Sequence, residues 1–143
     1  MQDIRWKQRY SNFAKILDLL CVNLQDKSPN DFTELEQIGL AKSFELCFEL
    51  MWKLLKDYME HEGVEIGLIS PKNILKSAAD KGLLQLISVN GDILMDAHAA
   101  RNGLVHVYDH EEFCRTLTEI KDSFLPEIVK VESYFNGLMN NDE

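Results

Sequence analysis

The sequence predicts an all-α fold, an up-and-down bundle of about five helices. Two observations lead to this: apolar residues recur at helical spacing over most of the chain, and no segment shows the alternation of a half-buried strand. Only three prolines interrupt the helical pattern. A chain of 143 residues with 45% apolar residues fits a single domain over residues 1–143, which can bury about two-thirds of its unfolded surface.

Two long helices are expected in the first half. Residues 4–24 carry apolar side chains at helical spacing, from Trp6 to Leu24. Residues 27–31 break the pattern, and Asp31 or Thr33 can cap the helix that follows. That helix, residues 32–61, is the longest. Its apolar stripe is too wide for one interface, so it should lie at the centre, contacted on two or three sides.

Three further helical segments are expected in the second half. Residues 70–82 begin with Ser-Pro and end in glycine, which is typical of a short helix. Residues 90–101 form the next segment. A last long helix begins near residues 109–112, where acidic side chains complement the helix N-terminus. It runs to about residue 138, with a kink or break near Pro126.

Composition limits the functional classes. The net charge of −9 argues against broad, sequence-independent nucleic-acid binding but leaves room for one local cationic pocket. No apolar run approaches the ~18 residues that a membrane span needs. Residues 1–6 lack the apolar core of a signal peptide, so the expected location is the cytoplasm. Cys21, Cys47 and Cys114 are widely spaced and are expected to be reduced thiols rather than zinc ligands.

Residues 101–108, Arg-Asn-Gly-Leu-Val-His-Val-Tyr, are the most informative segment. Arg101 can balance phosphoryl charge, and His106 can move protons near neutral pH. Together with Tyr108 they suit chemistry at a phosphodiester. On an ideal helix Arg101 and His106 would point about 140° apart. Gly103 is therefore expected to redirect the chain so that the two side chains converge.

A structural role explains the same residues equally well at this stage. Arg101 would interact with helix-terminal carbonyls, Gly103 would cap the helix, His106 would make a local hydrogen bond and Tyr108 would pack. Arginine, histidine and glycine are all favoured at helix C-termini. From the residues alone the two interpretations remain open.

Other polar residues carry weaker signals. Asp92, Asp96 and His98 share no helical face, so we exclude a metal site there. The alternating Lys and Glu residues of segment 42–56 are typical of a solvated helical face. No glycine-rich phosphate loop is present, so we expect no cofactor.

The chain resembles the HEPN-domain proteins encoded beside a minimal nucleotidyltransferase, long labelled nucleotidyltransferase substrate-binding proteins. Residues 101–108 match their R-N-x-x-x-H-x-Y motif, which is R-x-x-x-x-H-x-Y when the asparagine position is left open. Residues 44–53 are similar to their F-E-x-x-F-E-x-x-W-K helix, and Ser70-Pro71 with Ala78 and Gly82 matches the next short helix. The resemblance covers most of the chain.

This resemblance implies a homodimer and a partner minimal nucleotidyltransferase acting as antitoxin. The chain would be a ribonuclease toxin of a type VII toxin–antitoxin pair, cutting tRNA or mRNA without a metal ion and leaving a 2′,3′-cyclic phosphate. Arg101 and His106 would be catalytic.

The resemblance also assigns supporting roles. Asn102 would support the two catalytic residues, Glu45 or Glu49 would orient Arg101, and Tyr108 would accept AMP from the partner. The alternative is a non-catalytic subunit that binds substrate or nucleotide for a nucleotidyltransferase.

Overall fold

The computed structural model describes residues 2–104 and 109–141. The described chain is built from helices, with no strand in those two ranges. In chain order the helices are α1 (Gln2–Leu24), a 3₁₀ turn η1 (Pro29–Asp31), α2 (Glu34–His61), α3 (Pro71–Asp80), α4 (Leu83–Ile87), α5 (Gly91–Leu104), α6 (His110–Glu119), a π-helical turn η2 (Ile120–Phe124) and α7 (Leu125–Asn141). The predicted all-α bundle is confirmed.

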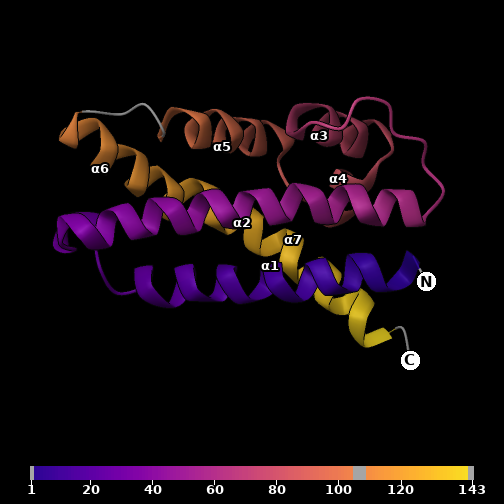
Figure 1. Ribbon diagram of the computed structural model, residues 1–143, viewed down its shortest axis with the longest axis horizontal. Coiled ribbons are helices and arrows are strands. Elements are labelled where there is room, and N and C mark those ends of the chain that lie inside the picture. Colours follow the sequence, from indigo (N-terminus) through magenta and orange to yellow (C-terminus); the bar gives the residue numbers. More distant parts are fainter. Residues whose placement is uncertain (1, 105–108, 142–143) are drawn as a thin grey trace.

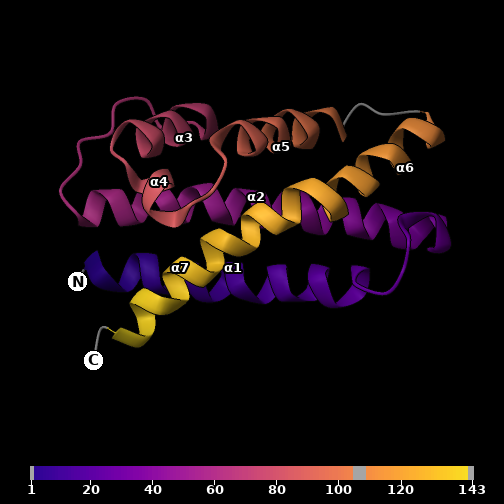
Figure 2. The same cartoon turned by 180° about the vertical axis from the view of Figure 1, so that it is seen from behind.

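Helix α2 lies at the centre of the bundle, as its wide apolar stripe predicts. It contacts α1, α3, α5 and α6. Figure 1 shows α1 running beside most of α2, while α3 and α5 lie on the other side of α2. Seen from behind in Figure 2, α6 and α7 form one long, bent arm that crosses both α1 and α2. The fully buried side chains come mostly from α1, α2 and α7: Phe13, Leu20, Phe44, Phe48, Met51, Leu54, Leu55, Ile128 and Phe135.

The start of α2 is defined by Thr33, one of the two caps that the sequence predicts. Its hydroxyl accepts a hydrogen bond from the Glu36 N–H at 3.2 Å, and the Glu36 carboxylate accepts one from the Thr33 N–H at 2.8 Å. This reciprocal capping box satisfies two backbone donors that the first turn would otherwise leave without partners. It sets where α2 begins.

The start of α5 is anchored to α7. The Asn90 side chain accepts hydrogen bonds from the Asp92 and Ile93 N–H groups at 2.9 and 3.3 Å. The Asn90 N–H in turn donates to the buried carboxylate of Glu127 on α7 at 2.8 Å. A long-range hydrogen bond to a charged acceptor thus holds the N-terminal end of the helix that carries Arg101.

Two elements differ from the sequence expectation in detail. Helix α4 has only five residues, too few for a periodic apolar pattern, and it follows directly after Gly82, which adopts a left-handed φ of 81°. The kink expected near Pro126 takes the form of the π-helical turn: the Leu125 N–H donates to the Ile120 carbonyl, five residues back. Proline has no N–H, so a local shift in hydrogen bonding just before it is physically reasonable.

In the described residues no helix has both the length and the apolar character to cross a membrane.

Candidate functional site

The candidate residues of the described chain come from two helices far apart in sequence. Arg101 and Asn102 lie in the last turn of α5, and Glu45 and Glu49 lie in the middle of α2. His106 and Tyr108 lie outside the described residues. The structure therefore bears on the cationic half of the motif and on the carboxylates around it.

Gly103 does not redirect the chain, contrary to the sequence expectation. It lies inside α5, which continues to Leu104, and it has no positive φ; in the described chain only Gly63 and Gly82 do among the glycines. No atom lies within 4 Å of the position that a Cβ would occupy there. A glycine inside a helix costs only about 1 kcal/mol, so the last turn of α5 tolerates it. Arg101 and Asn102 are consequently held on regular helix.

The Glu49 carboxylate is the centre of the site. Its Oε2 accepts hydrogen bonds from Arg101 Nη2 at 3.2 Å and from Trp52 Nε1 at 3.0 Å, while Lys53 Nζ lies 3.2 Å from Oε1. Partial burial alone would raise the pKa of Glu49. The hydrogen bonds from Trp52 and Lys53, with the charges of Lys53 and Arg101, outweigh burial, so the pKa is lowered. Glu49 is therefore a firmly ionised anchor for Arg101.

Asn102 holds the Arg101 guanidinium from the other side. Arg101 Nη1 donates to Asn102 Oδ1 at 3.1 Å, so both terminal nitrogens of the guanidinium have partners and the plane is oriented. Arg101 Nε is buried without a hydrogen-bond partner in the described parts of the chain. Asn102 and Glu49 each take one N–H, of Nη1 and Nη2, so each terminal nitrogen keeps a second N–H that can donate to an oxyanion.

The local charge is positive although the protein as a whole is acidic. Arg101 and Lys53 share the single Glu49 carboxylate, so this trio carries one net positive charge. The side chains of Arg101 and Glu49 are each 29% exposed, and an anion can therefore reach them from solvent while they remain partly shielded from it. The acidic net charge of −9 thus leaves room for a local cluster of positive charge.

Glu45 takes a different partner. It pairs with Lys42 at 3.7 Å, and Lys42 is 83% exposed. Of the two acidic residues that the resemblance suggests for orienting Arg101, Glu49 makes that contact in the described structure. Glu45 lies one helical turn earlier, and its side chain is 20% exposed.

The structure adds His98, which the sequence analysis considered only within a rejected set of metal ligands. Asn102 Nδ2 lies 3.4 Å from His98 Nε2, and the imidazole stacks on the Phe48 ring with centroids 5.8 Å apart and an interplanar angle of 20°. The available signal was the four-residue spacing between His98 and Asn102, which places them on one helical face. In the described chain no three His, Cys, Asp or Glu side chains are grouped so that they could hold a metal ion.

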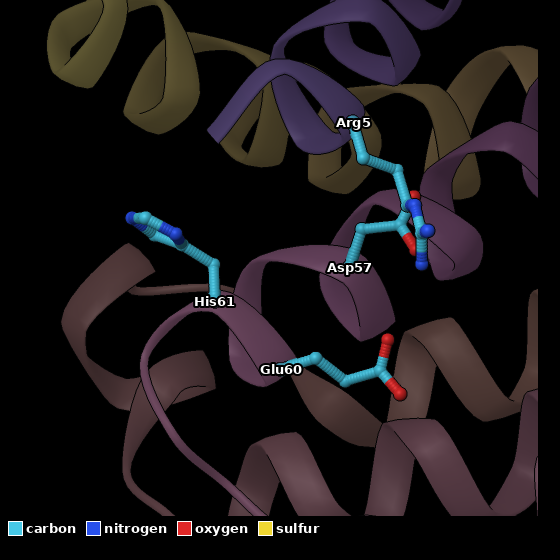
Figure 3. Close-up of a pocket in the computed structure, with 4 residues that line it drawn as sticks. All are labelled: Arg5, Asp57, Glu60 and His61. Carbon is cyan, nitrogen blue, oxygen red and sulfur yellow. The ribbon is translucent and has the colours of Figure 1, made fainter. Parts of the chain in front are cut away.

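A polar pocket lies at the C-terminal end of α2, lined by Arg5, Asp57, Glu60 and His61 (Figure 3). Figure 3 shows the Arg5 side chain lying alongside Asp57, while the His61 ring points away from the other three. The buried Asp57 carboxylate already accepts a hydrogen bond from Arg9 Nε at 3.0 Å. This pocket is therefore part of an ion-pair network that joins α1 to α2, about 12 Å along the helix from Glu49.

Comparison with known proteins gives one family. The sequence model of the family described as "nucleotidyltransferase substrate binding protein like" matches residues 8–136. The match includes Glu49, Arg101 and Asn102 as well as the positions of His106 and Tyr108, and it confirms the resemblance that the sequence motifs indicate. A search of the curated proteins gives no match.

Proposed function

We propose that this chain, which belongs to the family described as "nucleotidyltransferase substrate binding protein like", is a HEPN ribonuclease toxin. It cuts RNA without a metal ion and forms a type VII pair with a minimal nucleotidyltransferase, which neutralises it by adding AMP to Tyr108. The chain acts as a homodimer in the cytoplasm, on tRNA or mRNA.

One observation carries the proposal. The Arg101 guanidinium is oriented by Glu49 at 3.2 Å and by Asn102 at 3.1 Å, and still has free donors. A purely structural arginine at a helix C-terminus would be expected to hydrogen-bond the last carbonyls of its own helix. Arg101 instead takes a carboxylate on another helix, five residues before His106, which supports a role in binding an oxyanion.

The proposed reaction is transesterification of RNA. A base, His106, takes the proton of the ribose 2′-hydroxyl, and the 2′-oxygen forms a new bond to phosphorus. The bond from phosphorus to the 5′-oxygen of the next nucleotide breaks, and that oxygen receives a proton from an acid. The products are a 2′,3′-cyclic phosphate and a 5′-hydroxyl. Arg101 stabilises the charge on the phosphoryl oxygens at the transition state.

Dimerisation supplies the second proton-transfer group. One chain has one motif histidine, but a two-fold interface duplicates every residue, so two copies of His106 can serve as base and acid at one cleft. Both proton transfers and the charge stabilisation then come from side chains. This is why we expect cleavage to proceed in EDTA.

Modification of Tyr108 accounts for the neutralisation. The partner transfers AMP from ATP, so a bond forms between the tyrosine oxygen and the α-phosphorus, and pyrophosphate leaves. The attached phosphate is an anion, and together with its nucleoside it excludes RNA from the Arg101 site by charge repulsion and by bulk.

The test uses purified protein, free of its partner, incubated with tRNA and total RNA in EDTA. The matched control is His106→Ala. We expect the parent to cut and the variant to leave RNA whole, with mass spectrometry first showing that Tyr108 carries no AMP. In cells, expression alone should arrest growth, and His106→Ala or the partner should relieve it. Equal toxicity of the parent and His106→Ala would overturn the mechanism.

A second candidate is a non-catalytic subunit that binds substrate or nucleotide for a nucleotidyltransferase. The family description speaks of substrate binding, which is the role that such a subunit would have. Intact RNA after incubation with protein whose Tyr108 is unmodified would select this candidate over the ribonuclease.

A further inference from the structure

We infer that His98 is a positioning residue of the Arg101 site: as a neutral imidazole it fixes the Asn102 side chain, which in turn orients the Arg101 guanidinium. The inference rests on the proposed function for its catalytic consequence. The geometry that carries it, however, can be measured independently of any RNA cleavage.

The orientation of the Asn102 amide follows from its two neighbours. Its Oδ1 accepts a hydrogen bond from Arg101 Nη1 at 3.1 Å, and its Nδ2 lies 3.4 Å from His98 Nε2. Turning the amide over would place its NH₂ group against the guanidinium, donor against donor. Arg101 therefore selects the orientation in which Asn102 presents its NH₂ group to His98.

That orientation also selects the protonation state of His98. Because an amide NH₂ only donates, His98 Nε2 must offer its lone pair, and the ring proton must reside on Nδ1. A protonated imidazole would carry an N–H on Nε2 and face the NH₂ of Asn102 with a second donor. The contact with Asn102 can therefore form only with neutral His98.

The surroundings of His98 favour the neutral form. Burial, followed by the charges of Arg101 on its own helix and Lys72 on α3, lowers the pKa of the imidazole below its ordinary value of 6.5. From α2 the side chain that contacts the His98 ring is the apolar ring of Phe48, and the carboxylate of the next residue, Glu49, is engaged by Arg101. The charges that lower the pKa of His98 thus belong to two cations, Arg101 and Lys72.

Two consecutive residues of α2 contact His98 and Arg101 on α5. Phe48, fully buried, stacks on His98, and Glu49 accepts from Arg101. His98 and Arg101 are one helical turn apart on α5, so the two helices meet at two adjacent points. His98 Nδ1 is buried and has no hydrogen-bond partner in residues 2–104 and 109–141, so the ring is held by stacking and by Asn102.

The test compares His98→Gln with His98→Leu. A glutamine amide oxygen can take the place of Nε2 as acceptor, whereas leucine keeps apolar bulk but has no acceptor. We expect His98→Leu to lose about 10- to 100-fold in kcat/KM for RNA cleavage, the scale of a displaced positioning group. His98→Gln should stay within about threefold of the parent, with the same thermal midpoint as His98→Leu. His61→Leu, the same change at the far end of α2, is the matched control and should cleave as the parent does.

The opposite results are equally clear. Parent-like cleavage by His98→Leu would overturn the inference. So would a His98→Gln variant as slow as His98→Leu at equal thermal stability, because the acceptor would then be irrelevant.

NMR separates this inference from the proposed function. The ¹⁵N shifts of His98 should show the neutral ring with its proton on Nδ1 and a titration midpoint below 6.5. The Asn102 side-chain amide should shift in His98→Leu and recover in His98→Gln. If the parent cuts no RNA but these signals appear, the ribonuclease fails while the positioning of Asn102 stands. A ring protonated on Nε2 would refute the positioning whatever the RNA assay gives.

Discussion

Replacing Glu49 with glutamine should destabilise the protein through its contact with Arg101. The change keeps the size of the side chain but removes the charge that Arg101 meets at 3.2 Å and Lys53 at 3.2 Å. A buried hydrogen bond to a charged group contributes about 1.5–3 kcal/mol, and an exposed ion pair less than about 1 kcal/mol. With both Glu49 and Arg101 29% exposed, we expect a coupling energy of about 1–2 kcal/mol.

The assay is a double-mutant cycle of urea unfolding at pH 7 with Glu49→Gln, Arg101→Met and the double variant. Glu45→Gln is the matched control: the same substitution one turn earlier on the same helix, where the partner Lys42 is 83% exposed. Its cost should stay below about 0.5 kcal/mol. A Glu49–Arg101 coupling energy below about 0.3 kcal/mol would show that the contact does not hold the guanidinium.

The pH dependence of this effect has a definite sign. The fold lowers the pKa of Glu49 from its ordinary value of 4.5, so the unfolded chain binds the proton more tightly. The stabilisation is then fully present above about pH 4.5 and is lost as the pH falls through the lower, folded pKa. The difference in unfolding free energy between the parent and Glu49→Gln should shrink below pH 4.5; a difference that grows there would contradict the assignment.

Three further predictions concern the bundle that carries the site. Asp57→Ala should cost about 3 kcal/mol in urea unfolding, because it removes the buried partner of Arg9; a cost below about 1 kcal/mol would show that the pair is not stabilising. Phe135→Ala should cost about 3–5 kcal/mol, because its ring is fully buried, and an unchanged thermal midpoint would contradict this. Burial raises the pKa of both the Cys21 and the Cys47 thiol, but Cys21 is partly exposed and Cys47 is fully buried, so a disulfide reagent at pH 8 should modify Cys21 well before Cys47, and equal rates would refute it.

Local signals in the sequence determined most of the helical architecture. The Ser-Pro start of α3, the glycine after it and the threonine before α2 act through backbone hydrogen bonds and φ angles within a few residues. The sequence therefore locates these boundaries without knowledge of the fold. Helix α4 escaped prediction because five residues are too short for periodicity to appear.

The candidate site also has one part that the sequence determines and another that only helix packing decides. The order Arg101, Asn102, His106 and Tyr108 is written in the sequence, and with the helix of residues 44–53 it sufficed to identify the family. Which carboxylate meets Arg101 depends on how α2 is aligned against α5. Glu45 and Glu49 differ by one turn of about 6 Å, and that alignment is decided by packing between residues about fifty positions apart.

Tertiary structure alone also decided the roles of Gly103 and His98. A glycine near a helix end can terminate the helix or continue it, at a difference of about 1 kcal/mol that the surroundings readily override. His98 acquires its stacking partner from another helix, and its neutral state comes from burial and from cations on two helices. Propensities and motifs act within a turn or two of the chain, whereas charge, burial and ring contacts depend on distances that exist only once the helices have packed.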